Sequence, residues 1–480
     1  MRRPDTRARG RIATLAVIIA GLLWLVASFA VAADKLEIRV LYCGEPGSAR
    51  EADFCSFLER HFSKVAQGDF RDFKEEQARD YDVVLFDWSG TSRGGVVETA
   101  NVAQLKNRAP KLSPEYSRPT IFIGAGGYVA HLLRIKIDWL CLCLDGPAYK
   151  LNLEHKIFHR PLEVGAQLES IPTRKDYRYK TIDPDLGDAM QVWHVQTKNW
   201  PEIDSGLVST LYGFTDSPDA EVFAQGLAAK GPDTAALARQ GNFFLWGFSA
   251  TPSNMTPSGQ RLFVNAIAYM RAFDGQRPLV HSAASSREWA LRNALWPRAL
   301  AEGAAEKAFQ EAEPVLRGVF KDQPELSKDF KDIDSYLAMQ KASFAKIYAT
   351  ELETSLPADL RERFGTDSDK YLAYYRENLE FLRPAAADSH QFIVDDDAKN
   401  VGSSNRKIEL LDRCVSMLER NDQPELATRL LRRYTQEEFD TAQRWRDWLE
   451  TNRKRLFFSD VGGFKFFVGP TAIRRVLNAD

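Results

Sequence analysis

The chain has 480 residues, of which 44% are hydrophobic and 27% are charged, and its formal net charge is −2 at pH 7. A chain of this length predicts about two or three domains, each with its own core. The balance becomes more acidic without the arginine-rich first 32 residues, which argues against a nucleic-acid-binding protein. Five cysteines are too few for a disulfide scaffold.

Residues 1–33 are predicted to be a secretory signal peptide. Five arginines precede an apolar run from Ile12 to Val31, and Ala30-Val31-Ala32 is a small-residue cleavage pattern. About 20 apolar residues can also span a bilayer, so the alternative is an uncleaved N-terminal anchor. We therefore expect an exported protein, either periplasmic or extracellular, or anchored in the inner membrane. This segment is the only membrane contact that the sequence predicts.

Residues 34–275 alternate strand and helix patterns, which predicts an α/β domain with a mostly parallel sheet. The strongest strand patterns lie at 36–42, 81–86, 119–123 and 242–248. Between about 136 and 230 the pattern is less regular and contains short strand candidates. An amphipathic helix at 259–273 closes the domain.

Beyond a predicted linker at 276–285, the sequence becomes charged and helical in its periodicity. Residues 286–480 are therefore expected to form a helical domain, through which a protein partner could bind. Leu456–Phe458 and Phe464–Val468 flank Ser-Asp-Val-Gly-Gly, a turn signal that predicts a terminal β-hairpin.

Three stretches carry a family resemblance over residues 36–273. They are DYDVVLFDWSG at 80–90, RPTIFIGAGG at 118–127 and GNFFLWGFSATPSNMTPSGQRLFVNAIAYM at 241–270. In this order they resemble the class I glutamine amidotransferase-like superfamily, and LEHKIFHRPLEV at 153–164 resembles its trehalose-utilisation (ThuA-like) branch. The resemblance implies a flavodoxin-like three-layer sandwich.

Catalytic amidotransferases carry a nucleophilic cysteine in a strained turn before the central helix. The matching turn here is Gly124-Ala125-Gly126-Gly127, which has no Cys, Ser or Thr. Glutamine hydrolysis is therefore not expected, and whether the protein is an enzyme at all stays open. The turn either binds an anion or a sugar hydroxyl on its backbone amides or only lets the strand and helix pack closely.

Ligands in such sheets bind beyond the carboxyl ends of the strands. This rule predicts a ligand site made by Gly44, Glu45, Asp87, Trp88 and the turn at 124–127. Glu45 and Asp87 are weak candidates for an acid–base pair, and Trp88 could stack on a sugar. The alternative is that Asp87 caps a turn and that Glu45 is solvated.

No cofactor and no metal site are predicted. Asp395-Asp-Asp397 lacks the spacing of a calcium loop. Cys43, which ends the first strand, is a second and weaker candidate nucleophile. Alternatively, Cys43 could form a disulfide with Cys55 in an oxidising compartment.

Three functions are compatible with these patterns. The first is a binding protein for a small polar ligand such as a carbohydrate. The second is a hydrolase or isomerase that acts on a sugar-derived substrate through carboxylates. The third is a structural protein of the cell envelope that uses the α/β domain as a rigid scaffold.

Overall fold

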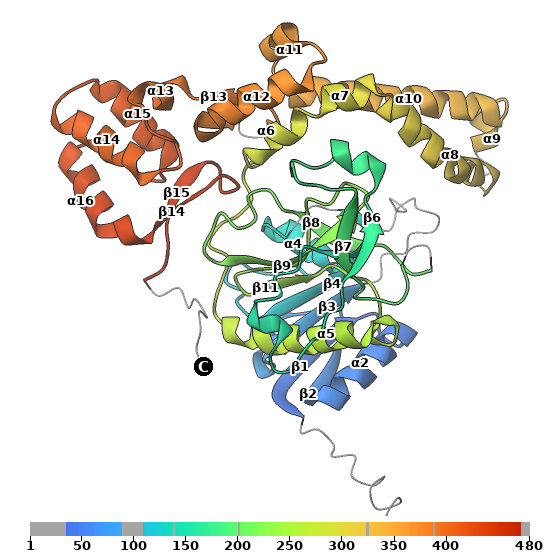
Figure 1. The fold of residues 1–480 in the computed structure, drawn as a ribbon. Coiled ribbons are helices and arrows are strands. Elements are labelled where there is room, and N and C mark those ends of the chain that lie inside the picture. The colour runs from blue at the N-terminus through green and yellow to red at the C-terminus, as the bar shows by residue number, and fades with distance from the viewer. Residues whose placement is uncertain are drawn as a thin grey trace, which may run out of the picture.

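The computed structural model describes residues 35–88, 109–137, 141–199, 202–322, 326–386 and 389–471. An α/β region is followed by a helical region that ends in a β-hairpin, and the helical region lies as a bar across one end of the α/β region (Figure 1). The predicted signal segment lies outside the described residues. In the part of the chain that the structure describes, no helix is long and apolar enough to cross a membrane.

One large mixed sheet forms the centre of the α/β region. Its strands are β1 (Leu36–Gly44), β2 (Phe62–Asp69), β3 (Val83–Trp88), β4 (Thr120–Gly124), β5 (Cys141–Tyr149), β6 (Glu169–Pro172), β7 (Ala189–Trp193), β8 (Gly206–Thr210), β9 (Ala220–Ala228), β10 (Thr234–Gln240) and β11 (Phe243–Trp246). Five neighbouring strands, in the order β2-β1-β3-β4-β11, are parallel. Their carboxyl ends therefore meet at one edge of the sheet.

The prediction of a mostly parallel sheet is wrong for the other half. There β10 pairs antiparallel with β8, β9 and β11, and β5 pairs antiparallel with β7, β8 and β9. A parallel pair needs a long crossover connection, usually a helix. Between β5 and β10 the only helical segments among the described residues are short 3-10 turns, and short links such as residues 229–233 return the chain antiparallel.

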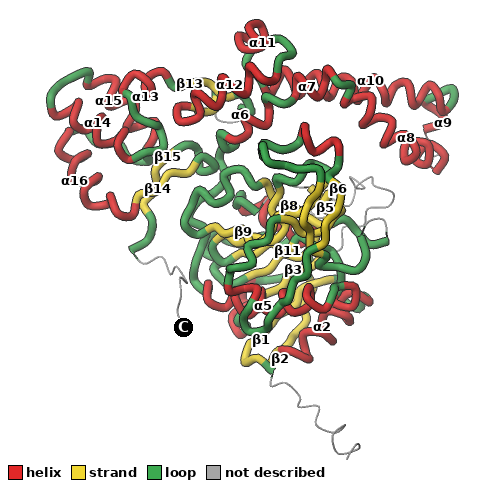
Figure 2. Tube along the Cα trace, in the orientation of Figure 1, coloured by secondary structure: helices red, strands yellow, loops and turns green. Residues whose placement is uncertain are grey.

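Helices lie on both faces of the sheet, and Figure 2 shows the two on one of them, α2 (Ala49–His61) and α5 (Pro257–Met270). On the other face lies the short α4 (Tyr128–Leu133). A hydrophobic core lies on each face of the sheet. Because side chains alternate along β1, Val40 and Tyr42 belong to the core under α2 and α5, and Leu41 and Cys43 belong to the core on the other face. The α/β region thus has three layers.

The helical region contains two long helices, α8 and α10, several shorter ones and two small hairpins. Its helices are α6 (Glu288–Asn293), α7 (Trp296–Ala301), α8 (Ala304–Asp322), α9 (Leu326–Asp329), α10 (Ile333–Ser355), α11 (Ala358–Phe364), α12 (Ser368–Asn378), α13 (Asp396–Val401), α14 (Ile408–Glu419), α15 (Pro424–Tyr434) and α16 (Ala442–Asn452). Its hairpins are β12 (Leu382–Pro384) with β13 (Phe392–Val394), and β14 (Leu456–Ser459) with β15 (Lys465–Val468).

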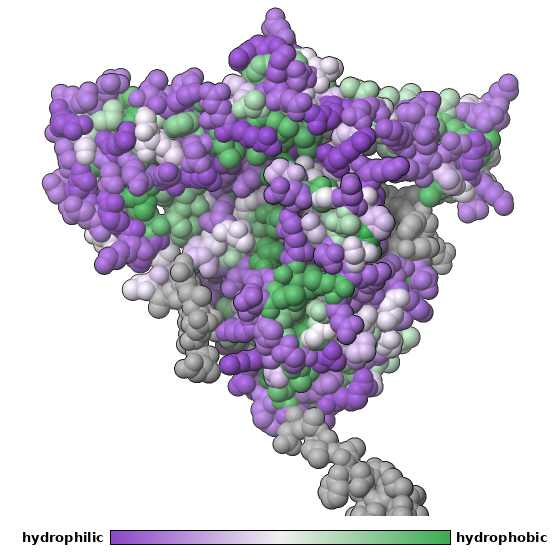
Figure 3. All heavy atoms as spheres, viewed as in Figure 1, coloured by the Kyte–Doolittle hydropathy of each residue, from purple (hydrophilic) through white to green (hydrophobic). Residues whose placement is uncertain are grey.

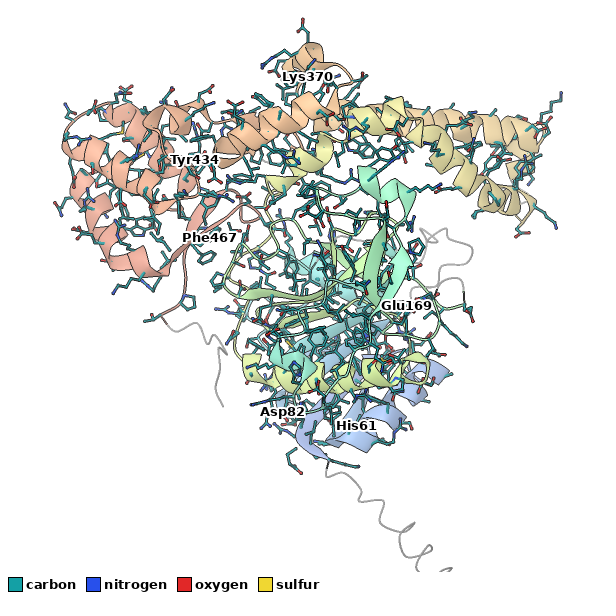
Figure 4. All side chains as sticks on the ribbon, viewed as in Figure 1. His61, Asp82, Glu169, Lys370, Tyr434 and Phe467 are labelled. Atoms are coloured by element: carbon teal, nitrogen blue, oxygen red, sulfur yellow. The ribbon has the colours of Figure 1, made fainter. Side chains whose placement is uncertain are left out.

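The two ends of the bar differ. α8 packs on α10 at one end, and α13 to α16 gather at the other (Figure 1). Figure 4 shows Tyr434 among these C-terminal helices and Phe467 on the β14–β15 hairpin below them. Hydrophilic residues cover most of the face of the bar that Figure 3 shows, so its apolar residues mainly serve its own core.

The turn of the β14–β15 hairpin fastens the helical region to the α/β region. Asp460 accepts two hydrogen bonds of 2.8 Å from the side chain of Arg287, which precedes α6. The neighbouring Ser459 Oγ and Val461 N–H donate to the carboxylate of Asp216, at 2.8 and 3.1 Å. Asp216 is in turn ion-paired with the buried Lys136 of the α/β region.

Arg287→Met is expected to lower the free energy of unfolding by about 3–5 kcal/mol, because it leaves the Asp460 carboxylate buried without its partner. Urea denaturation followed by circular dichroism measures this. Arg317→Gln is the matched control, since Arg317 pairs with Glu313 on one exposed face of α8 and should cost less than about 1 kcal/mol. Equal losses in the two variants would contradict the proposed importance of the Arg287–Asp460 pair.

Candidate functional site

The predicted strand-end residues do meet at one edge of the sheet. Trp88 lies beside Gly124 in the β3–β4 register, and Gly44 ends the neighbouring strand β1. Ser89 and Gly90, which follow Trp88 in the sequence, lie outside the described residues. The parallel order of β1, β3 and β4 is what brings these distant segments together.

The carboxylate of Asp87 is held by hydrogen bonds within the protein. Its side chain is 1% exposed, and its two oxygens accept hydrogen bonds of 2.7 Å from Nε and Nη2 of Arg50. The hydroxyl of Tyr42 donates a third, at 2.5 Å, and burial together with the Asp87 carboxylate raises the pKa of Tyr42. Arg50 also reaches the Ser249 carbonyl oxygen. These contacts tie β1, α2, β3 and the loop after β11 together.

Glu45 lies apart from this ion pair. Its side chain is exposed, and its electrostatic neighbour is Arg71, whose pKa it helps to raise after the larger effect of Asp69. Trp88 packs on Phe70, with 5.4 Å between ring centroids, and Arg71 lies 5.6 Å from the Trp88 ring. The predicted acid–base pair therefore has one carboxylate held by an arginine and the other in solvent.

The glycine turn is tightly packed. Gly124 has φ +52° and ψ −131°, and a Cβ on Gly126 would lie 2.2 Å from the Phe86 carbonyl oxygen. A Cβ on Gly127 would lie 2.1 Å from the Leu207 side chain. Residues 124–127 are all buried, and the principal cavities of the described structure are lined by other residues. The glycines were expected either to bind a ligand on their backbone amides or to let strand and helix pack closely. Close packing accounts for these contacts.

Gly126→Ala is therefore expected to destabilise the protein by about 1–3 kcal/mol or more, because backbone atoms of β3 cannot move away from the added methyl group. The midpoint of thermal unfolding measures this. Gly318→Ala in α8 is the matched control, since its Cβ would meet nothing within 4 Å, and it should hold stability or raise it by up to about 1 kcal/mol. A fully stable Gly126→Ala protein would show that the turn is open.

Cys43 does not have the surroundings of a nucleophile. Its thiol is 1% exposed, and burial, assisted by Asp69, raises its pKa. Burial likewise raises the pKa of Cys55 to about 11 and that of Cys414 to about 12. All three thiols are free, so the disulfide considered between Cys43 and Cys55 is not formed.

Because a thiolate is the reactive form, iodoacetamide at pH 8 should leave Cys43, Cys55 and Cys414 unmodified in the native protein. The same treatment in urea should modify all three, which mass spectrometry of proteolytic peptides would show. Rapid native labelling of Cys43 would restore it as a candidate nucleophile.

A cavity lined by aromatic side chains lies elsewhere, between the two regions. This junction cavity has a volume of about 580 Å³. The α/β region contributes Lys136, Lys180, Thr210, Tyr212, Phe214, Ala229, Lys230 and Asp233, and the helical region contributes Trp289, Arg292, Asn293, Trp296, Ile347, Tyr348, Glu351, Ser355 and His390. Binding sites commonly lie between domains in cavities of this size, with aromatic walls and a few polar groups.

Two aromatic pairs form walls of the junction cavity. Tyr212 packs edge-to-face on Trp289, with 5.2 Å between ring centroids, and Trp296 packs edge-to-face on Tyr348, with 5.5 Å between them. The Tyr212 hydroxyl donates to Asp233 at 2.6 Å, and burial raises the pKa of Tyr212 first, followed by the charge of Asp233. The cavity thus combines apolar ring surfaces with fixed polar groups.

The sequence contained a signal for this site. Trp289, Arg292 and Trp296 are spaced by three and four residues, a spacing that places side chains on one face of a helical segment. An arginine at this spacing from a tryptophan predicts a cation–π contact, and Arg292 lies 5.6 Å from the centroid of the Trp296 ring. The opposite wall, from Thr210 to Asp233, has no comparable signal, because antiparallel strands and their turns assemble it.

Comparisons with known proteins give a likeness in structure alone. No family model matches the chain, and no curated protein matches its sequence. Nine chains of solved structures match. One, from Thermoplasma acidophilum, is described as "a putative gmp synthase subunit a protein"; the match covers 50% of this chain and 96% of that chain, with 11% sequence identity and a TM-score of 0.24. A match at this level is no guide to activity.

Proposed function

We propose that this chain is an exported binding protein that holds a small polar ligand, such as a carbohydrate, in the junction cavity. The observation that carries the proposal is the cavity itself, with its two aromatic pairs beside fixed hydrogen-bonding groups. Aromatic rings with polar neighbours suit a ligand that has both apolar faces and hydroxyl groups.

The α/β domain is proposed to be a ThuA-like member of the amidotransferase-like superfamily that has lost its nucleophile. The strand order β2-β1-β3-β4-β11 supports this, because it is the 2-1-3-4-5 order of flavodoxin-like sheets. Gly124 has the positive φ expected of the strained turn, but a glycine has no side chain to attack a substrate. The domain would then serve as a scaffold that carries one wall of the cavity.

Export is part of the same proposal. The arginine-rich start, the apolar run and the cleavage pattern before residue 33 support secretion or an N-terminal anchor. Glutamine-dependent synthesis usually takes place in the cytoplasm, where ATP and partner enzymes are available. A domain without the nucleophile, in a chain with an export signal, fits ligand binding better than amide transfer.

The alternative of a sugar-directed hydrolase acting through Glu45 and Asp87 has less support. General acid–base catalysis needs two carboxyl groups that reach one substrate. Asp87 is buried against Arg50, and Glu45 is exposed beside Arg71. The two carboxylates therefore have different partners, which does not favour their acting together on one substrate.

The test is a panel of neutral and acidic mono- and disaccharides, measured by thermal shift and then by isothermal titration calorimetry. At least one sugar should bind, and Trp296→Ala should weaken it roughly tenfold or more, because it removes one aromatic wall. Trp448→Ala, which removes a partly buried tryptophan of α16 away from the cavity, should lower stability without changing affinity. If no sugar binds, or if both variants bind equally well, the proposal fails.

A further inference from the structure

Arg292 is a partly buried arginine that lines the junction cavity and has no carboxylate partner among the described residues. Three others are each ion-paired with a carboxylate at 2.7–2.8 Å: Arg50 with Asp87, Arg239 with Glu221 and Arg287 with Asp460. Within the described residues Arg292 makes no ion pair, and its one hydrogen bond is from Nη1 to the carbonyl oxygen of Tyr179, at 2.5 Å. Most of the five N–H groups of its guanidinium are therefore available.

Two acidic residues line the junction cavity, Asp233 and Glu351, and Asp233 already has hydrogen-bond partners. Its carboxylate accepts hydrogen bonds from the Tyr212 hydroxyl at 2.6 Å, from Thr181 Oγ1 at 2.8 Å and from the backbone N–H of Ile182 at 2.9 Å. Burial lowers the pKa of Arg292, although Tyr212 and Asp233 act in the opposite direction. A guanidinium stays charged in proteins, and this one is partly exposed and lies 5.6 Å from the centroid of the Trp296 ring, so an aromatic face, and no carboxylate, is beside its charge.

Other charged side chains lie near Arg292. A second cavity of about 670 Å³ adjoins the junction cavity and shares Lys180, Arg292, Trp296 and Tyr348 with it. This second cavity adds four cationic side chains and two acidic ones to the lining, which are Arg174, Lys175, Arg178, Lys307, Asp176 and Glu311. Asp176 is ion-paired with Arg174 and Lys180, and Glu302 is ion-paired with Arg178. Lys175 and Lys307 are the cations of this lining that make no ion pair with a described carboxylate.

We propose that the ligand of the junction cavity is an acidic saccharide, whose carboxylate pairs with the free edge of the Arg292 guanidinium. A carboxylate matches the planar fork of the arginine guanidinium, and it would supply the negative partner that this positive charge lacks. The adjoining Trp296–Tyr348 pair offers ring surface to the sugar itself, which a bare inorganic anion would leave unused. The inference rests on the proposed function and adds the class of ligand.

The experiment compares matched probes by isothermal titration calorimetry on the full chain without its first 33 residues. The probes are glucuronate with glucose, digalacturonate with galactobiose, and inorganic phosphate. Each acidic sugar is expected to bind at least tenfold more tightly than its neutral partner, and its affinity should fall between 50 and 500 mM NaCl. Arg292→Gln should remove that advantage while leaving the weaker neutral binding in place.

Arg298→Gln is the matched control, because Arg298 lies on α7 and pairs with the exposed Asp369 instead of lining either cavity. It should keep the full preference for acidic sugars. The salt dependence of the unmodified protein keeps the test valid if Arg292→Gln does not fold.

Three outcomes decide the matter. Equal affinity for acidic and neutral sugars, without a salt effect, overturns the acidic-saccharide inference and leaves the proposed function standing. Binding of phosphate as tight as that of the sugar acids overturns it as well, in favour of a plain anion site. If no sugar binds under any condition, the proposed function itself fails.

Discussion

The buried pair between Arg287 and Asp460 is the interaction on which the arrangement of the two regions depends. It joins the residue before α6 to the turn of the terminal hairpin, 173 positions later in the chain. Taking two charges out of water is costly, and the pair is stable only because its remaining groups are also satisfied. Arg287 donates further hydrogen bonds to the Leu379 carbonyl oxygen and the Asn405 side chain. The network fixes the hairpin turn in the position where Ser459 and Val461 donate hydrogen bonds to Asp216 of the α/β region.

The junction cavity follows from that constraint. One wall is carried by turns of the antiparallel half of the sheet, around Tyr212 and Asp233, and the other by α6, α7 and α10. Neither region encloses the space alone. The strand-end edge, where ligands bind in many sheets of this kind, is instead held together by the Asp87–Arg50 pair and the packed glycine turn. The parallel half of the sheet thus serves as support, and the junction cavity lies where the helical region meets the α/β region.

Much of the local structure could be predicted from the sequence, and for particular reasons. The apolar run ending at Asp87 is found as β3, and the helix expected at 259–273 is found as α5, begun by Thr256, whose hydroxyl accepts from the Gly259 N–H. The terminal hairpin is found at β14 and β15. In each case the signal is short-range, since periodicity, caps and turn residues act over a few positions. The irregular middle carried no such signal, and its antiparallel pairing was missed.

The sequence by itself determined the alternation of strands and helices, the change to a helical composition near residue 276, the absence of a nucleophile at 124–127 and the signal-like start. Only the tertiary structure decided that Asp87 is an internal ion-pair partner, that the glycines are packing positions and that Arg292 lacks a carboxylate. Whether a charge is paired depends on residues far away in the chain, such as Arg50 for Asp87 at a separation of 37 and Tyr179 for Arg292 at a separation of 113. Local patterns specify which side chains are present, and the fold specifies which of them remain open to a ligand.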